Sequence, residues 1–459
     1  MNTAKVLSRS SLKALASIFP GDALSLRPEE MLIYGTDAGK KFSMPWAVVR
    51  PERTEQVQEL MALAQKERIP VIPRARGTNV VSACVPDQGG VVLSCLRMNK
   101  VLSIDPRSFT ACVQPGVITH DLQKKVRSLG LYYPPDPASM KVSTIGGNIA
   151  TNAGGMSAVK YGVTRDYVLG LEAVLPGGEI IRTGGRVHKN VVGLDLTRLF
   201  TGSEGGLGII VKAWLKLLPA PEYSASILAC FEDEVMALEG VSRIFESGIL
   251  PCAMEFLPGE IMKCLAGYGP VPWPEDAGAC LIIRVDGSVD GTRHQTERIR
   301  QSLQNTLYLD VAGQEDEERI WEMRRLINPA SFSLGPDKVS DDVVVPRGVV
   351  LDAVQGIRAI ARKYALNILA FGHIGDGNIH VNYMHDASQP GSGQRVDQAR
   401  QEVLSLVLEL EGSISGEHGV GLSKKPFLTR QVGPRELEIM RSIKKVFDPY
   451  NILNPGKGI

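Results

Sequence analysis

Two histidines and a later Glu-His pair are the residues of this chain best suited to catalysis. His373 and His380 lie in the motif His-Ile-Gly-Asp-Gly-Asn-Ile-His, and Glu417 and His418 follow in Gly-Glu-His-Gly. Two imidazoles and one carboxylate leave coordination positions open, which suits a catalytic zinc site or a non-haem iron site. We therefore expect a metal-assisted site with His373, His380 and Glu417 as ligands.

The spacing of the two histidines predicts how they meet. Asp376-Gly377 is a strong hairpin signal, because both central positions of a type I′ turn need positive φ. With this dipeptide at the turn centre, His373 faces His380 on one side of the hairpin, with Cβ atoms about 5 Å apart. Asn382 falls on the same side. The alternative interpretation is a tight hairpin whose histidines are solvated or packed in a core and hold no metal.

Length and composition limit the class of protein. A chain of 459 residues exceeds what one hydrophobic core usually organises, so we expect at least two domains. A hydrophobic content of 44%, a charged content of 22% and a net charge of +1 are typical of a globular protein and show no basic surface for nucleic acid. The apolar runs 80–85 and 281–285 are as long as strands and far shorter than a membrane span.

The N-terminus and the cysteines predict the compartment. Residues 1–19 have the pattern of an amphipathic helix without the apolar core of a secretory signal, so we expect a cytoplasmic protein with no transmembrane segment. The seven cysteines contain no Cys-x-x-Cys pair and end at Cys280. They indicate reduced, mostly buried thiols, and an iron-sulfur cluster within this chain is not expected.

Glycine and proline predict the organisation of the chain. Five Gly-Gly pairs between residues 143 and 208 would suit loops that approach a flat or phosphorylated ligand, although turn glycines in a loop-rich α+β fold are the alternative. Neither a Rossmann fingerprint nor a P-loop lysine is present. Two prolines at 219–222 favour a domain boundary. The remaining expected elements are a strand and turn at 69–79, helices at 293–307, 394–411 and 435–447, and an extended tail at 451–457.

Several stretches resemble one enzyme family, in the order in which that family carries them. From around residue 45 the chain is similar to the FAD-linked 2-hydroxyacid dehydrogenases, which include the glycolate oxidase flavin subunit, D-lactate dehydrogenase and D-2-hydroxyglutarate dehydrogenase. The matching stretches are Pro134-Pro-Asp-Pro-Ala-Ser139, Ser143-Thr-Ile-Gly-Gly-Asn-Ile-Ala-Thr-Asn-Ala-Gly-Gly155, Tyr161-Gly162, Thr201-Gly-Ser-Glu-Gly-Gly-Leu-Gly-Ile209, the two histidine motifs described above and Phe447-Asp-Pro-Tyr-Asn-Ile-Leu-Asn-Pro-Gly-Lys457.

The resemblance implies an α+β fold built around FAD. It implies a vanillyl-alcohol-oxidase-type FAD-binding domain of two α+β subdomains, and an α+β ferredoxin-like cap domain that carries the metal. The expected segments are an N-terminal helical segment that packs on the FAD domain (1–44), the FAD-binding domain (45–219), the cap with substrate and metal (220–430), and a C-terminal helix and tail that return to the FAD domain (431–459).

The resemblance also implies roles for single residues. The metal falls to His373, His380 and Glu417, the catalytic base to His418, and the substrate carboxylate to Arg324 and Lys338. Without the resemblance, the two cations would be interpreted as solvated surface charge. The FAD pyrophosphate and flavin are assigned to Arg74, Ala75, Arg76, Gly77, Thr78, Asn79, Pro135, Ser139, Thr144, Gly146, Gly147, Asn148, Asn152, Ala153, Gly155 and Asn454, with Ile209 and Ile210 on the adenosine side.

One loop departs from the family pattern. Where the family usually has Pro-Arg-Gly-x-Gly-Thr-Gly, this chain has Pro73-Arg-Ala-Arg-Gly-Thr-Asn79, so two glycines are lost and Arg76 is gained. Ala75 makes a close backbone approach to phosphate harder. The loop contains no histidine, so we expect noncovalent FAD.

The function implied by the resemblance is oxidation of a small D-2-hydroxy acid, D-lactate or glycolate, to the 2-oxo acid. The implied metal is a divalent ion, with zinc favoured over iron or manganese. An iron-sulfur subunit, an electron-transfer flavoprotein or a quinone would take the electrons, and such a partner could hold the chain at the inner face of a membrane. The sequence leaves open whether two copies form a homodimer. The alternatives are a non-catalytic flavin subunit of a glycolate-oxidase-like complex and an oxygen-using oxidase of the same fold.

Overall fold

The computed structural model describes residues 7–39, 41–313 and 315–458, and the chain forms two compact units. Unit 1 consists of the described parts of Met1–Gly154, Val163–Ala220 and Glu417–Ile459. Unit 2 consists of Gly155–Gly162 and the described parts of Pro221–Gly416. No helix in the described part of the chain is long and apolar enough to cross a bilayer.

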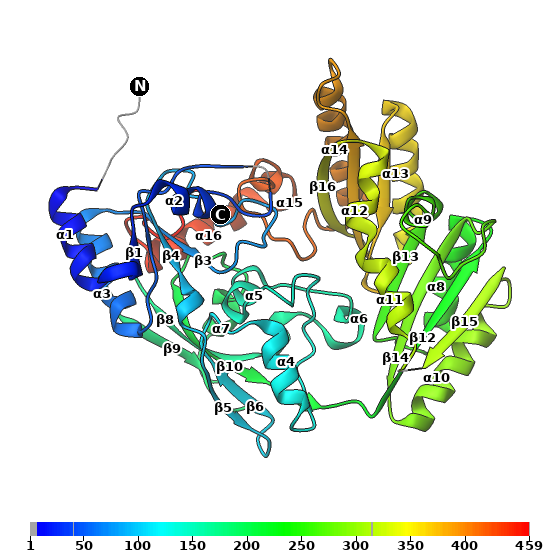
Figure 1. The fold of residues 1–459 in the computed structure, drawn as a ribbon, viewed down its shortest axis with the longest axis horizontal. Coiled ribbons are helices and arrows are strands. Elements are labelled where there is room, and N and C mark those ends of the chain that lie inside the picture. Colours follow the sequence, from blue (N-terminus) through cyan, green and yellow to red (C-terminus); the bar gives the residue numbers. More distant parts are fainter. Residues whose placement is uncertain (1–6, 40, 314, 459) are drawn as a thin grey trace. The chain divides into compact units, whose positions relative to one another are not determined.

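The first sheet of unit 1 is a βαβ arrangement with α1 (Arg9–Ile18) and α3 (Thr54–Glu67) on one face and α2 (Pro28–Tyr34) on the other (Figure 1). Three of its strands are parallel, and a short strand from the N-terminal segment is added antiparallel at the edge. Helix α3 buries Val57, Leu60, Met61 and Ala64 in the core of this subdomain, and α1 packs on α3. The strand order is β1 (Leu24–Ser25), β2 (Ala47–Val49), β4 (Val91–Ser94), β3 (Val71–Arg74).

The second sheet of unit 1 is antiparallel and completes the two predicted α+β subdomains. Its five strands are followed or preceded by short helices that carry the glycine-rich stretches. The order is β5 (Val101–Asp105), β6 (Thr110–Val113), β10 (Ile209–Lys216), β8 (Val168–Val174), β9 (Ile180–Gly184), and the helices are α4 (Thr119–Arg127), α5 (Ile145–Thr151) and α7 (Leu196–Phe200).

Two short stretches of unit 1 differ from the sequence prediction. The apolar run 80–85 is a turn and not a strand, because the Asn79 side chain accepts hydrogen bonds from Val81 N (3.0 Å) and Ala83 N (3.1 Å). The tail is not fully extended, since Asn451 and Asn454 have positive φ values of 51° and 41°. The predicted last helix is present as α16 (Pro434–Phe447).

The first sheet of unit 2 has the ferredoxin-like strand order. It is antiparallel, with α8 (Glu234–Glu246) and α10 (Val289–Ser302) packed on it. Helix α10 begins four residues before the predicted start and ends before 307, because the Ser288 hydroxyl caps it by accepting from Gly291 N at 3.2 Å. The strands in order are β13 (Ala253–Pro258), β14 (Ala279–Gly287), β12 (Tyr223–Phe231) and β15 (Tyr308–Gly313).

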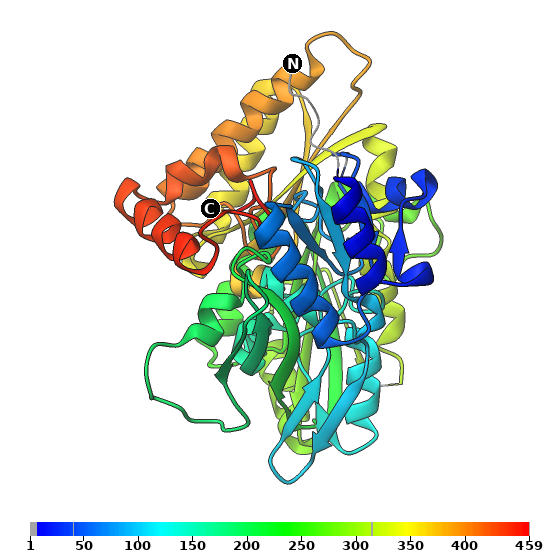
Figure 2. The same cartoon turned by 90° about the vertical axis from the view of Figure 1, so that its left-hand side faces the viewer.

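The second sheet of unit 2 carries the histidine motif. Helices α13 (Val350–Tyr364) and α14 (Ser392–Glu409) lie side by side and pack on it (Figure 2). An isolated antiparallel bridge between Phe256 and Gly372 links this sheet to β13 of the first. The strand order is β16 (Asp337–Val344), β18 (Asn378–His385), β17 (Asn367–Phe371), and helices α9 (Gly259–Ala266), α11 (Glu318–Arg325) and α12 (Ile327–Ser331) complete the unit.

The unit boundaries differ from the expected segments in two places. After Gly155–Gly162 the chain enters unit 2 a second time at Pro221, within the two-proline stretch, and it returns to unit 1 at Glu417 and not at 431. Buried Glu204 of unit 1 binds the backbone just after this return. In addition, Gly155–Gly162 belongs to unit 2, where Lys160 and the Tyr161 hydroxyl (2.8 Å) both contact the carboxylate of Asp286.

Candidate active site

The predicted register of the histidine hairpin is wrong. Phe371, and not His373, pairs with His380, because the strands are joined by a six-residue connection and not by a two-residue turn. The connection contains a 3-10 turn at Ile374–Asp376 that ends at Gly377, whose φ is +82°. The imidazoles nevertheless lie together, with ring centroids 5.0 Å apart and planes at 83°.

A buried carboxylate that the sequence analysis missed holds His373. Glu255 is 0% exposed, and one of its oxygens contacts Nδ1 of His373 while the other contacts Nε of Arg324. Burial raises the pKa of this carboxyl, but the charges and hydrogen bonds of Arg324 and His373 outweigh burial and lower the pKa to about 2. Glu255 is therefore ionised at neutral pH.

The two predicted carboxylate-binding cations lie in different surroundings. The Arg324 guanidinium contacts Glu255 and lies 5.5 Å from the centroid of the Phe371 ring, so it is placed beside the histidine pair. Lys338 contacts the side chain of Asn328 and lies 5.2 Å from the Phe332 ring centroid. The pairing of β16 with β18 puts Lys338 on the same sheet face as His380, about 13 Å further along the strand.

Asp342 is a second carboxylate on the face that carries His380. It pairs with His380 across β16 and β18, is 0% exposed, and has one oxygen 3.9 Å from His380 Nδ1. The same carboxylate accepts from Asn378 Nδ2 at 2.5 Å and from Gly416 N at 2.9 Å. A side chain at 416 would collide with Asn378, so glycine is needed where the chain reaches the Glu-His motif.

In unit 1, Glu417 and His418 lie on a loop that is fixed by the side chains of Asn79 and buried Glu204. Asn79 Nδ2 donates to the carbonyl of His418 at 2.9 Å, and Glu204 accepts from Val420 N at 2.7 Å. The His418 and Glu417 side chains approach each other to 4.0 Å. Burial raises the pKa of Glu204, although these backbone hydrogen bonds and two lysines oppose the shift.

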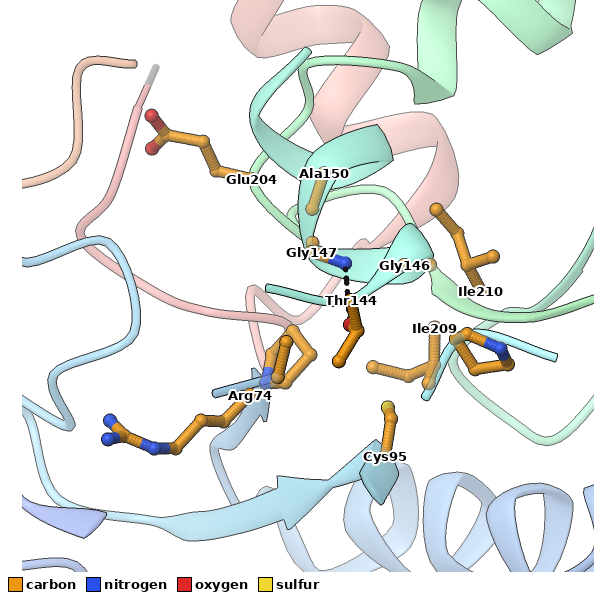
Figure 3. Close-up of a pocket in the computed structure, with 14 residues that line it drawn as sticks. Arg74, Cys95, Thr144, Gly146, Gly147, Ala150, Glu204, Ile209 and Ile210 are labelled. Atoms are coloured by element: carbon orange, nitrogen blue, oxygen red, sulfur yellow. Dashed lines mark hydrogen bonds between the residues drawn. The ribbon is translucent and has the colours of Figure 1, made fainter. Parts of the chain in front are cut away.

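A pocket in unit 1 lies where the glycine-rich stretches meet (Figure 3). Thr144 caps α5 by accepting from Gly147 N at 3.3 Å, and a Cβ on Gly146 would come within 2.5 Å of Pro115. Proline, cysteine and isoleucine side chains form apolar walls beside exposed glycine backbone, which suits a flat ring system joined to phosphates. The lining residues are Pro73, Arg74, Ala75, Cys95, Pro115, Thr144, Gly146, Gly147, Ala150, Glu204, Gly205, Gly208, Ile209 and Ile210.

Some predicted flavin-binding side chains face away from this pocket. The Arg74 guanidinium extends to the carbonyl of Thr36, and the Glu204 carboxylate likewise points outward (Figure 3). Asn148 donates to Thr119 Oγ1 at 2.8 Å, and Asn454 donates to the carbonyls of Ala83 and Glu204. Seven predicted residues line the pocket, namely Arg74, Ala75, Thr144, Gly146, Gly147, Ile209 and Ile210. The lining does not include Arg76, Gly77, Thr78, Asn79, Pro135, Ser139, Asn148, Asn152, Ala153, Gly155 or Asn454.

Comparison with known proteins decides the family. The family model described as FAD linked oxidases, C-terminal domain, matches residues 220–458, and the FAD binding domain model matches residues 45–184. The chain belongs to the FAD-linked oxidase family. It is an FAD-linked oxidoreductase, and the pocket of unit 1 fits the FAD that the matched domain binds.

Named relatives of this FAD-linked oxidoreductase span nearly its whole length. It is 43% identical over 430 residues to glycolate oxidase subunit GlcD of Bacillus subtilis (93% of this chain, 92% of that protein). It is 35% identical to D-lactate dehydrogenase of Anaerostipes hadrus (94% and 91%) and 33% identical to D-2-hydroxyglutarate dehydrogenase of Stutzerimonas stutzeri (95% and 96%).

Solved structures confirm the predicted fold class. The structure of p-cresol methylhydroxylase with substrate bound is similar at a TM-score of 0.79 and 19% identity, over 98% of this chain and 97% of that one. A 4-ethylphenol oxidase from Gulosibacter chungangensis is similar at a TM-score of 0.77 and 19% identity, over 99% and 98%. At these identities the likeness establishes the fold alone.

Proposed function

We propose that this oxidoreductase converts a small D-2-hydroxy acid, D-lactate or glycolate, into the 2-oxo acid, with a divalent metal held by His373, His380 and Glu417. The observation that carries the proposal is the imidazole pair of buried His373 and partly exposed His380, whose rings lie 5.0 Å apart with a carboxylate beside each ring. Three relatives support the substrate class by name, as a glycolate oxidase subunit, a D-lactate dehydrogenase and a D-2-hydroxyglutarate dehydrogenase.

The donor set suits a divalent ion. Two imidazoles and a carboxylate match zinc and leave positions for a substrate hydroxyl and carboxylate, and iron or manganese would accept the same ligands. Gly416 N donates a hydrogen bond to Asp342, which pairs with His380 across β16 and β18. The last residue of unit 2 before Glu417 therefore lies beside the histidine pair. This placement supports Glu417 as the third ligand.

The catalytic roles follow from the chemistry of each side chain. When bound, FAD accepts the hydride of the substrate α-carbon, and the metal ion lowers the pKa of the substrate hydroxyl. His418 takes the hydroxyl proton as general base. Arg324 binds the substrate carboxylate with its terminal nitrogens, and Lys338 adds a second positive charge. Among the described residues that line the pocket of unit 1 there is no histidine, which supports noncovalent FAD, so acid precipitation should leave the flavin in solution.

The electrons must then leave the chain. The seven cysteines are all buried and are not clustered as an iron-sulfur cluster requires. We propose an iron-sulfur subunit or an electron-transfer flavoprotein as the acceptor, which fits the description of two relatives as oxidase subunits.

The base is tested by His418→Asn. Flavin reduction by D-lactate or glycolate, followed by anaerobic stopped flow, should slow by roughly 10²- to 10⁴-fold, the usual worth of a positioned base. Metal and FAD contents should be unchanged. His385→Asn is the matched control, because His385 lies at the end of β18 and bonds to Ser392. An unchanged reduction rate in His418→Asn would exclude this role.

The metal site is tested by His380→Ala. This change removes one imidazole, so the bound metal, measured by mass spectrometry after dialysis, should fall to background while FAD stays bound. His385→Ala should keep its metal. Equal metal contents in the two variants would show that His380 is not a ligand.

A further inference from the structure

Glu255 contacts the side chains of His373 and Arg324 at the same time. Its strand neighbours Met254 and Phe256 are buried apolar side chains, and Glu255 itself is 0% exposed. We infer that Glu255 is a positioning residue that fixes the ligand orientation of His373 and ties it to the substrate-binding arginine. The inference rests on the proposed function, because it gives His373 the role of a metal ligand.

The backbone explains why Glu255 faces His373. Phe256 and Gly372 form an antiparallel bridge, with Phe256 N donating to Gly372 O at 3.0 Å. In an antiparallel pair the residue before one partner lies opposite the residue after the other, so Glu255 lies opposite His373. The backbone bridge between the two sheets of unit 2 therefore places the carboxylate opposite the imidazole.

The contact fixes where His373 carries its proton. Nε of Arg324 donates to one oxygen of Glu255, and the positive charge of the guanidinium favours the ionised form of the carboxyl group. An ionised carboxylate has no hydrogen to donate, and Nδ1 of His373 must therefore supply the hydrogen in this pair. The lone pair of Nε2 is then the one left for a metal, with the ring held by its other edge.

The same carboxylate couples metal binding to substrate binding. Nε of Arg324 donates to Glu255, and the guanidinium lies over the Phe371 ring, next to the histidine pair. This arrangement fixes the inner edge of the guanidinium and leaves its terminal nitrogens as the edge that can form a bidentate pair with a substrate carboxylate. Glu255 thus aligns the metal ligand and the arginine that would act on the hydroxyl and the carboxylate of a 2-hydroxy acid.

The first test is Glu255→Gln in the full chain with FAD bound. The amide keeps the size of the side chain but is a weaker acceptor and carries no charge. Zinc or manganese affinity, measured by competition with a chelating dye, should weaken by about 10- to 100-fold, the usual cost of losing the carboxylate partner of a ligating histidine. The KM for the hydroxy acid should rise as well, because Arg324 loses its anchor.

The matched control is Asp286→Asn. It also neutralises a buried carboxylate with a cationic partner in unit 2, but Asp286 contacts Lys160 and Tyr161 and not the histidines. Its metal affinity should stay within about twofold of the unchanged protein, a small fraction of the loss expected at a ligand-positioning residue. Equal metal affinity in Glu255→Gln and the unchanged protein would overturn the inference.

A second measurement needs no variant of Glu255 and does not depend on metal. In metal-stripped protein labelled with ¹⁵N-histidine, the His373 signal, assigned by its loss in His373→Ala, should show hydrogen on Nδ1 and not on Nε2. The Nε2-H tautomer would overturn the role of Glu255 even if metal binds. If His380→Ala and the unchanged protein hold equal metal while His373 is the Nδ1-H tautomer, the metal assignment fails and the positioning contact stands.

Discussion

Glu255 in unit 2 and Glu204 in unit 1 are both buried carboxyl groups, but their pKa values shift in opposite directions. Both side chains are nearly inaccessible, at 0% and 8% exposure. Glu255 faces the charged Arg324 and His373, and its pKa falls to about 2 in spite of burial. Burial raises the pKa of Glu204, whose nearest partners are backbone N–H groups. Two charged side chains in direct contact outweigh desolvation at Glu255, whereas the backbone N–H groups and two lysines near Glu204 oppose it only in part.

The largest effect should come from removing the charged partner of Glu255. Arg324→Met would leave a buried carboxylate without its guanidinium, which typically costs about 3–5 kcal/mol. Unit 2 should therefore unfold more easily, as measured by hydrogen exchange of peptides from β13 and β18. Arg319→Met is the control on the same helix, because Arg319 forms an exposed pair with Asp310 that is worth about 0–1 kcal/mol. Similar losses in both variants would contradict the comparison.

A smaller, pH-dependent effect is expected at Glu204. Its pKa is raised in the fold, so its contribution to stability is complete below the unfolded value of about 4.3 and is lost as pH rises through the folded pKa. Glutamine does not titrate, so Glu204→Gln removes this pH-dependent loss of stability. The free energy of unfolding of the variant minus that of the unchanged protein should therefore increase with pH.

The measurement is urea unfolding of both proteins at several pH values from 4.5 upward. Lys425 and Lys457 favour the ionised carboxylate and lower the pKa of Glu204, but burial raises it by more. Glu438→Gln, which removes an exposed carboxylate of α16 paired with Arg435, controls for the change in net charge. A difference that decreases with pH would mean that Glu204 behaves like Glu255.

The smallest effect should come from removing one hydroxyl donor of a carboxylate that keeps its charged partner. Glu317 accepts from Ser224 Oγ at 3.0 Å and Ser226 Oγ at 2.7 Å, and it lies 3.3 Å from Arg284 Nε. Ser224→Ala removes one of these donors at a partly exposed position and should destabilise unit 2 by about 1 kcal/mol, the usual net worth of one hydrogen bond. A loss as large as that of Arg324→Met would show that a neutral hydroxyl donor contributes as much as a charged partner.

Helices, strands and the family could be predicted from the sequence, but contacts between strands far apart in the chain could not. Short-range signals located α16 and placed strand β14 over the apolar run 281–285. The hairpin register failed because Asp376-Gly377 belongs to a longer connection, and the turn rule assumes two residues between paired strands. Both imidazoles still meet, since a six-residue connection folds His373 back toward His380.

The missed acidic residues share one signal that could have been used. Glu255 lies within the apolar run Ala-Met-Glu-Phe-Leu, and Asp342 directly precedes Val-Val-Val, so each carboxylate adjoins apolar strand residues. A charged residue at such a position is buried only with a partner, which marks it for attention. The identity of the partner depends on the Phe256–Gly372 bridge, and no local pattern encodes a bridge between residues more than a hundred positions apart.

The discontinuity of unit 1 has a consequence for synthesis on the ribosome. Val71 in the first sheet accepts a hydrogen bond from Asn454 N at 2.9 Å and donates to Ile452 O at 2.8 Å, so this sheet is completed by a segment translated almost 400 residues later. All of unit 2 emerges before that segment. All residues of unit 2 are therefore synthesised before unit 1 is complete. Until the C-terminal segment emerges, β3 has an unpaired edge, which can bind a chaperone or start aggregation.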